Sequence, residues 1–580
     1  MNIHAKGTER ESARDIICLD FDFGSRSYEE EKEHLLKLKS MATKESQIRI
    51  DNILSQVEKN KYKYKKLSKD GIREQFYSEG VCVRYNHYDK KGNVIKTEAI
   101  DYAMLYRNSS KAKLGQVMFI RKELYDVAYD WLTMGLGKKM PRHNAKIVEM
   151  SAYAPLTTST IVDTIAIPVK DILILKDVDS IFKIKVKAVK AENYECDERI
   201  IDEDKTRELY DKAISNGKLD LYGNPIYKQQ YKKEKVTKKR CVVSDEELEI
   251  KNTLWDGMAL IEHDCCPEWV NGMALLRQHF FKSDAFVTYI QKFFKSWCLK
   301  NDINYDTYEI KDMFGISHKL KDIKMITTHN AVKWLKFKDL MGNSLQEAYQ
   351  YWCDRVNENG SLFGIVKTDH VSKLGDVQQM SYQMINTLDC TAYDVEQIAE
   401  ISKNCVERLK TDDEYFKEFL IKNSNKINHY MMLADMYEYN PNIAKTNWFR
   451  KEKSSIIKNY VAKLRSGKIT VPGDNLTVCG NPYALLLYAV GENYENDPTL
   501  EKEDGAIQCY TTRFADGEYL CAFRNPHNSP NGVVHLHNVY SKEMREYFPF
   551  SENIIAVNNI HTDIQDRCNG MDYDFGNWVG

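Results

Sequence analysis

Two aspartates separated by one residue, Asp572 and Asp574, follow an Asn-Gly pair near the carboxyl end of this 580-residue sequence. In an extended segment alternate side chains point the same way, so both carboxylates would face one spot while Tyr573 faces away. Two oxygen ligands beside a glycine turn suit Mg²⁺, which commonly takes one or two protein carboxylates and completes its shell with water and phosphate. An Asp-x-Asp pair alone is weak evidence, because such pairs are common on solvated turns. In the right setting it provides the ligands for metal-assisted phosphoryl transfer.

The bulk composition is that of an ordinary globular protein. Hydrophobic residues make up 43% and charged residues 29% of the sequence, and the net charge is −2. No global positive field therefore attracts nucleic acid, and any such binding must come from local patches. The sequence has no run of 18 apolar residues and no apolar core of a signal peptide at its start, so we expect no membrane segment and a cytoplasmic location.

Metal sites of the zinc type are not expected. None of the 14 cysteines forms a Cys-x-x-Cys pair, and the histidines near the carboxyl end lack cysteines at the required spacing. Those histidines are His527, His535, His537 and His561. A second Asp-x-Asp, Asp20 and Asp22, fits an edge strand with one polar face better than a metal site.

The periodicity of the first half predicts mixed structure. We expect helix over 28–69 and 118–136, a β-hairpin over 80–100, and mainly β-structure over 145–190. Between 195 and 250 acidic residues come first and a basic cluster follows at 228–240, with Tyr227 and Tyr231 beside it. Two interpretations stay open for this stretch, a solvated linker or long hairpin and a contact to a phosphate backbone.

The second half divides into a helical and a β-rich part. Residues 376–465 have apolar residues at helical spacing and are expected to form a connector. Short apolar runs with Gly, Pro and Asn between them then predict strands at 469–472, 485–488, 519–523, 533–536 and 553–557. Strands at this spacing are typical of a small barrel or sandwich.

The order of motifs over residues 467–574 resembles the catalytic barrel of the cellular, or eukaryotic-type, RNA-dependent RNA polymerases and their phage relatives. Five features occur in the same order as in that family. They are Gly467–Pro472 as a first strand, the turn Cys479-Gly480-Asn481, the stretch Asp516-Gly517-Glu518 before a strand ending in Arg524-Asn525-Pro526, the strand within Phe548–Val557, and Asn569-Gly570-Met571-Asp572-Tyr573-Asp574 at the place of the metal-binding loop.

A fainter match lies upstream. Asp256-Gly257 and Arg277 to Lys282 are similar to elements of the family's first barrel, and Lys367 to Lys373 are similar to its basic strand. Residues 1–140 show no match and form a region of unknown role.

The resemblance implies an α+β fold with two double-psi β-barrels linked by a helical segment, and an α/β region before them. The implied divisions are 1–140, a first barrel region over 141–375 with an insertion at 287–360, the helical connector 376–465, and the catalytic barrel 466–580.

The same resemblance implies roles for individual residues. Asp572 and Asp574 would bind Mg²⁺, for which Mn²⁺ substitutes, and Lys282 and Lys373 would stabilise phosphate charge from the facing barrel. Arg277, Lys367, Arg524 and Asn525 would contact nucleic acid or nucleotide; for Arg524 a structural pairing beneath the turn is an equal alternative. The implied activity is RNA synthesis on an RNA or single-stranded DNA template from nucleoside triphosphates.

The sequence departs from the family after Asp574. The family has Gly and a third Asp there and continues into further helices, whereas here Phe575 and Gly576 follow and the sequence stops at Gly580. From this we expect a gene truncated or frameshifted after Asp574, or a second polypeptide that supplies the rest. The alternative function is therefore a catalytically inactive protein that binds nucleic acid or assists assembly.

Overall fold

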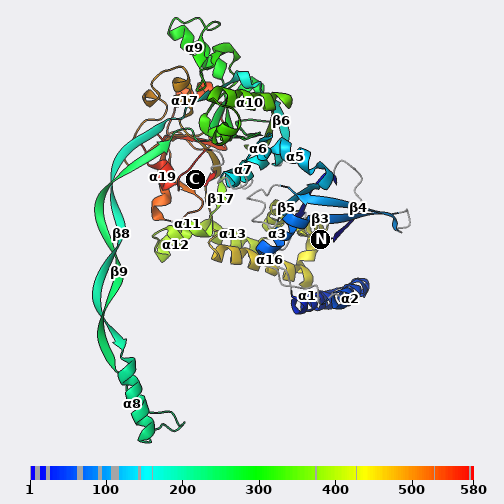
Figure 1. Ribbon diagram of the computed structural model, residues 1–580, viewed down its shortest axis with the longest axis vertical. Helices are drawn as coiled ribbons and strands as arrows, with labels where there is room; N and C mark the ends of the chain where they lie inside the picture. The colour runs from blue at the N-terminus through cyan, green and yellow to red at the C-terminus, as the bar shows by residue number, and fades with distance from the viewer. Residues whose placement is uncertain are drawn as a thin grey trace. The chain divides into compact units, whose positions relative to one another are not determined.

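The computed structural model has an α+β fold (Figure 1). It describes residues 2–6, 14–20, 27–42, 44–59, 61, 69–88, 94–105, 116–140, 146–159, 161–372, 375–425, 428–527, 529–573 and 577–579. Asp574, Lys373 and Asp22 lie outside these residues. Within them, none of the helices is long and apolar enough to cross a membrane. The chain divides into two compact units, residues 179–252 and the remainder.

The amino-terminal region contains a five-stranded sheet in the order β1-β3-β4-β5-β2. The expected hairpin over 80–100 is confirmed as β3 (Val81–Tyr88) paired with β4 (Val94–Met104). Asp20 ends β2 (Ile16–Asp20), which is an edge strand as expected. The remaining elements are β1 (Asn2–Lys6), β5 (Gln116–Arg121), α1 (Tyr28–Met41), α2 (Lys44–Lys59) and α3 (Lys69–Glu79).

A seven-stranded sheet follows, in the order β6-β16-β11-β12-β10-β15-β7. Its strands are β6 (Asp163–Ala166), β7 (Ile172–Leu175), β10 (Met258–Glu262), β11 (Met273–Gln278), β12 (Phe281–Thr288), β15 (Met325–Thr328) and β16 (Leu362–Thr368). One face packs in a core with α10 (Leu345–Glu358), and the other face shares a core with the second half of the chain. The expected first closed barrel is not seen among the described residues, because β6 and β7 at the two ends of this sheet are not paired with each other.

The stretch 287–360 contributes to this sheet. Its strand β15 pairs with both β10 and β7, and its helix α9 (Ile290–Lys300) packs beside β10. Met325 and Ile326 are fully buried, so the stretch expected as an insertion supplies part of the core.

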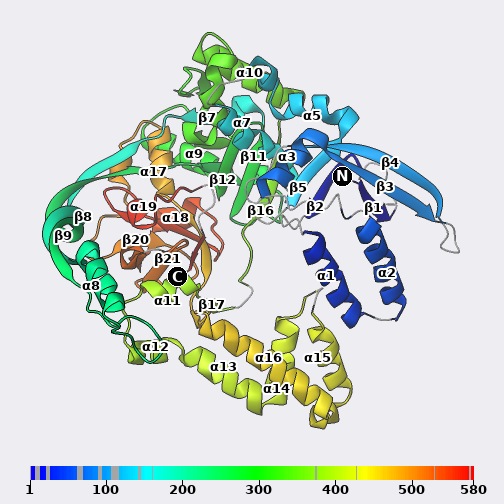
Figure 2. The same cartoon turned by 60° about the horizontal axis from the view of Figure 1, so that its bottom comes forward.

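Residues 376–465 are largely helical, as expected. The helices are α11 (Tyr382–Thr387), α12 (Ala392–Ile398), α13 (Glu400–Thr411), α14 (Asp413–Lys422), α15 (Tyr430–Tyr439) and α16 (Asn447–Arg465). The last four pack together around a core that includes Leu409, Phe416, Leu433, Phe449 and Ile456 (Figure 2).

The carboxyl-terminal region forms a closed six-stranded barrel, in the order β19-β23-β20-β22-β21-β24. Its strands are β19 (Asn475–Cys479), β20 (Ile507–Tyr510), β21 (Tyr519–Arg524), β22 (Val533–Asn538), β23 (Ile554–Val557) and β24 (Asn577–Val579). The strand expected at 469–472 is β18 (Thr470–Pro472), which pairs with β17 (Val377–Gln379) outside the barrel. The prediction of a strand at 485–488 is wrong, because these residues lie in the helix α17 (Pro482–Ala489).

Residues 179–252 form the second unit. Two 23-residue antiparallel strands, β8 (Asp179–Ile201) and β9 (Tyr231–Thr253), make a long two-stranded ribbon with α8 (Glu203–Ser215) at its tip (Figure 1). The stretch is therefore a long hairpin, and a phosphate contact by its basic cluster stays a prediction. Within the ribbon Lys238 pairs with Glu198 at 2.8 Å and Arg240 with Glu192 at 3.0 Å, so part of the basic cluster is neutralised across the strands.

Candidate active site

The loop that carries Asp572 is shaped by a left-handed turn. It runs from the end of the short helix α19 (Ile564–Arg567) toward β24. Asn569 and Gly570 have φ values of 57° and 63°, a region that glycine enters without strain and asparagine more readily than most residues. The backbone N–H of Gly570 donates to the carbonyl of Gln565 at 2.8 Å, which fixes the turn.

Side chains alternate along the loop as the sequence predicts. Met571 and Tyr573 are buried, at 3% and 0% exposure. The Asp572 side chain between them is 42% exposed. The burial of its neighbours therefore directs Asp572 outward.

Arg524, at the end of β21, lies beneath this loop. Its Nη1 donates to the carbonyl of Cys568 at 2.7 Å, and its Nη2 lies 3.9 Å from Oδ1 of Asp572. Arg524 thus makes the structural pairing that the sequence left as an alternative to a nucleic-acid contact. Its neighbour Asn525 is exposed and accepts a hydrogen bond from Ser381 at 3.1 Å.

Tyr573 anchors the loop to the segment before β10. Its backbone N–H donates to the carbonyl of Asp256 at 2.9 Å. Its hydroxyl accepts from Nδ2 of Asn559, which also donates to the carbonyl of Leu254, both at 2.7 Å. Burial raises the pKa of Tyr573, so the hydroxyl stays protonated. The loop is thereby held against the Asp256-Gly257 motif.

Gly480 lies at a close approach between the end of β19 and the segment before β10. A β-carbon there would stand 2.7 Å from the carbonyl oxygen of Leu254, 3.1 Å from Nδ2 of Asn559 and 3.2 Å from the ring of Tyr573. The next residue, Asn481, accepts from the backbone of Asn559 at 2.9 Å and, through its carbonyl, from the indole of Trp255 at 3.0 Å. The predicted turn at Cys479-Gly480-Asn481 therefore belongs to the same junction.

Basic residues share the face of the seven-stranded sheet that looks toward the barrel. Arg277 is paired across the strands with Lys282. Leu275 is paired with Asp284 on one side and Lys367 on the other. Directly opposed residues lie on the same face of a sheet.

The apolar residues on this face show that it is the side of the sheet that faces the barrel. Met273 and Phe286, also cross-strand partners, belong to the core shared with barrel residues such as Val478 and Ile554. Arg277, Lys282 and Lys367 therefore occupy the barrel-facing side, which places three predicted site residues on one surface.

Asp284 connects this face to the loop. Its side chain is 1% exposed, and its backbone N–H donates to the carbonyl of Gly257 at 2.9 Å. Burial first, and then the charge of Asp284, raise the pKa of the Cys479 thiol at the end of β19. Lys282 stands two residues from Asp284 on the same side of β12, about 7 Å along the strand.

Four residues around this junction differ in exposure and in hydrogen bonding. Arg277 is 7% exposed and donates from Nη1 to its neighbour's carbonyl, that of Leu276, at 2.8 Å. Lys282 and Lys367 are half-buried. Asp369, in the predicted basic strand segment, is buried and accepts from the backbone of Gly272 at 3.1 Å.

The Asp572 carboxylate is partly exposed. Among the described residues, no three His, Cys, Asp or Glu side chains gather into a metal site. The second carboxylate, Asp574, lies outside the described residues.

Comparisons with known proteins include a distant likeness in structure. No family model matches the sequence, and no curated protein matches it. Among solved structures, the RNA-dependent RNA polymerase QDE-1 from Thielavia terrestris is similar over 86% of this chain, at 10% identity and a TM-score of 0.44. The chain spans only 48% of the length of that polymerase chain. The expected second polypeptide finds no support in these comparisons.

Asn559 is the site residue that sequence reasoning missed. Asn559 is completely buried, as is Asn481 of the predicted turn, and the two asparagines join the loop, β19 and the Leu254–Trp255 segment. Asn559 follows directly after the apolar strand β23 in the pair Asn558-Asn559. Two adjacent asparagines at the end of a buried strand are unusual, because buried amides need several partners, and this was the available signal.

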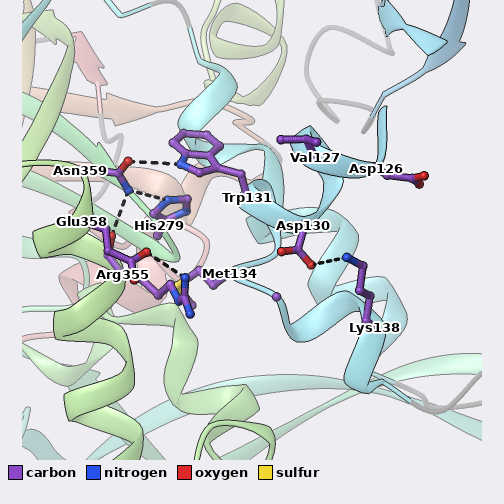
Figure 3. Close-up of a pocket in the computed structure, with 11 residues that line it drawn as sticks. Asp126, Val127, Asp130, Trp131, Met134, Lys138, His279, Arg355, Glu358 and Asn359 are labelled. Carbon is purple, nitrogen blue, oxygen red and sulfur yellow. Dashed lines mark hydrogen bonds and ion pairs between the residues drawn. The ribbon is translucent and has the colours of Figure 1, made fainter. Parts of the chain in front are cut away.

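A separate pocket of about 380 Å³ lies beside the hairpin that joins β11 and β12 (Figure 3). The imidazole of His279 and the indole of Trp131 meet there edge to face, with ring centres 4.4 Å apart. Asn359 accepts from Trp131 and donates to Nε2 of His279 at 3.2 Å. None of the predicted site residues lines this pocket, and its Asp130 and Lys138 are paired at 3.0 Å.

Proposed function

We propose that this protein carries out template-directed nucleotidyl transfer, the synthesis of RNA on an RNA or single-stranded DNA template. The observation that supports this most directly is the junction between barrel and sheet. There the loop bearing Asp572 is tied to Asp256, next to a sheet face that carries Arg277, Lys282 and Lys367. The ordered motifs of residues 467–574 support the same function.

Residues from the sheet and from the barrel would have different roles in this reaction. A 3′-hydroxyl attacks the α-phosphate of the incoming nucleotide, and pyrophosphate leaves. Lys282 and Lys373 would neutralise the charge that develops on the phosphate oxygens, while Arg277 and Lys367 would bind the phosphates of template or nucleotide. Arg524 would act as a positioning residue for the loop, through its bond to the Cys568 carbonyl.

Mg²⁺, or Mn²⁺ in its place, would be held by Asp572 and Asp574 together with nucleotide phosphates, and would supply charge neutralisation. The loop that carries Asp572 is held in place in the absence of the ion. Tyr573 and Met571 are buried, and the hydrogen bonds of Tyr573 to Asp256 and Asn559 help to fix the direction of Asp572.

Primer extension with labelled nucleotides tests the proposal. The double variant Asp572→Asn, Asp574→Asn should lose incorporation by a factor of at least about 10², because transition-state charge stabilisation is typically worth that much. The matched control, Glu501→Gln with Asp504→Asn, removes two exposed carboxylates and should keep full activity. Incorporation that survives the first variant would mean that the site lies elsewhere.

A second candidate is a nucleic-acid-binding protein without catalytic activity. It is favoured by Phe575 and Gly576, which stand where the similar polymerases have Gly and a third Asp. This candidate predicts salt-dependent RNA binding by the unchanged protein with no incorporation under Mg²⁺ or Mn²⁺. Incorporation that depends on Asp572 and Asp574 would exclude it.

A further inference from the structure

The longest helix of the connector, α16, is strongly basic. Its 19 residues include six cations, Arg450, Lys451, Lys453, Lys458, Lys463 and Arg465, and one acidic residue, Glu452. Glu452 is bonded to His429 at 3.2 Å, and Lys453 to Asp413 at 2.6 Å. The other five cations are exposed, and within the described residues none of them has an ion pair.

Three of these cations form a straight stripe. Lys451, Lys458 and Arg465 are spaced by seven residues, so they lie nearly above one another, two helical turns or about 10.5 Å apart. Ser454, Ser455 and Ala462, which lie between them on this side, are small and exposed, and Val461 is half-buried. A row of regularly spaced positive charge results, about 21 Å long.

A pocket of about 490 Å³ lies at the amino-terminal end of the same helix. Four cations line it, Lys410, Lys445, Arg450 and Lys453, with a single carboxylate, that of Asp413. Lys445 is bonded only to the neutral side chain of Asn442, at 2.9 Å, among the contacts of the described residues. Lys410 is paired with Glu407 at 2.8 Å, so Lys445 and Arg450 are the cations that leave the pocket positively charged.

We infer that the outer face of α16, together with this pocket, binds the sugar–phosphate backbone of a nucleic-acid strand. Regular positive charge with serine hydroxyls between suits a chain of phosphates, which lysine and arginine contact without reading sequence. A membrane surface is a poor fit, because an interfacial helix inserts its apolar face, and here Phe449, Ile456 and Ile457 are buried in the helical bundle.

This surface is additional to the proposed active site and needs neither nucleotide nor metal. Binding can thus be measured in EDTA, by fluorescence anisotropy of a labelled 30-nucleotide oligouridine with the full-length protein. The triple variant Lys451→Gln, Lys458→Gln, Arg465→Gln should bind at least tenfold more weakly at low salt. The slope of log affinity against log salt should become shallower by about 2, since single strands contribute about 0.7 per neutralised phosphate.

Two matched variants isolate the charge of this face. Lys300→Gln, Lys311→Gln, Lys319→Gln removes three exposed charges outside the connector and should leave the affinity unchanged. Lys451→Arg, Lys458→Arg, Arg465→Lys keeps the charge and should also bind as the unchanged protein does. Thermal unfolding should be the same for all, because the altered side chains are exposed.

Two results would overturn the inference. Equal affinity and equal salt slope in the Gln triple variant and the unchanged protein would overturn the inference. So would binding of the unchanged protein to vesicles of anionic phospholipid that is lost in the Gln triple variant while its RNA affinity persists. Asp572→Asn with Asp574→Asn should not alter this binding, so a failure of the proposed catalysis and a failure of this surface are distinguishable.

Discussion

At the scale of single residues, the loop next to the sheet is positioned by packing. Met571 and Tyr573 fill the interior on either side of Asp572, and the Tyr573 hydroxyl accepts a hydrogen bond from the buried Asn559 amide. The carboxylate direction is therefore set in the folded protein before any ligand binds, which is the preorganisation that electrostatic catalysis needs.

Gly480 offers a sharp test of this junction. In Gly480→Ala the new methyl group would meet the Leu254 carbonyl, a backbone atom that cannot turn aside. We expect a loss of about 1–3 kcal/mol in the free energy of unfolding, together with looser anchoring of Tyr573. Urea denaturation measures the loss.

Gly505→Ala serves as the comparison, because that position has φ 86° but open space around it. It should cost only the backbone strain, about 1–2 kcal/mol. A Gly480 variant as stable as the unchanged protein would mean that barrel and sheet do not approach as described.

His279 makes stability depend on pH. Burial, and secondarily the charge of Arg355, lower the pKa of His279 to about 4, so the unfolded chain takes up the proton first as the pH falls below 6.5. The folded state therefore loses stability between pH 6.5 and 4, by up to about 3 kcal/mol for this group. His279→Gln should reduce the difference in unfolding free energy between pH 7 and pH 4.5, measured by urea denaturation; an unchanged difference would contradict the assignment.

At the scale of elements, closure of the barrel depends on the three-residue strand β24. It pairs with β19 on one side and β21 on the other, with Trp578 opposite Leu476 and Arg524. Trp578→Pro removes a backbone donor from a strand paired on both sides and should cost about 3 kcal/mol or more. The variant Trp578→Tyr keeps the donor and should cost less; equal melting temperatures for the two variants would show that β24 is not a paired strand.

Several elements were predictable because their patterns are local. The hairpin β3–β4, the long ribbon, the helical connector and the strands β21, β22 and β23 follow from alternation, helical spacing and turn residues. The loop geometry around Asp572 followed from simple alternation as well.

Other elements depended on contacts that local pattern does not contain. The run Leu485-Leu486-Leu487-Tyr488 fits a buried strand as well as a buried helix, and Pro482 at the first turn together with burial on nearly all sides decided for α17. The pairing of β15 with β10 and β7 joins residues about 65 and 150 positions apart, so the sheet could not be read from periodicity.

At the scale of the whole molecule, the ribbon of residues 179–252 is a self-contained unit. The chain on either side of it is already joined within the larger unit, since the N–H of Leu254 donates to the carbonyl of Val178 at 3.0 Å. Replacing residues 180–251 by a short Gly-Ser linker should therefore leave the melting temperature of the rest within a few degrees.

The same deletion decides between the two interpretations of the basic cluster at 228–240. Because Lys238 and Arg240 are paired with Glu198 and Glu192, we expect the RNA affinity to change by less than about twofold. A tenfold loss, measured by the anisotropy assay, would instead assign a phosphate contact to the ribbon.

Closure of the barrel also has a consequence for biosynthesis. The first strand, β19, pairs with β23 and β24. Because β24 is translated about 100 residues after β19, the second of these pairings can form only late in synthesis. Until then β19 and β21 each present a row of unpaired backbone groups to solvent, the kind of surface on which nascent chains associate wrongly. Production at low temperature or with a chaperone that shields nascent chains should therefore raise the yield of folded protein more than any change to its surface charge.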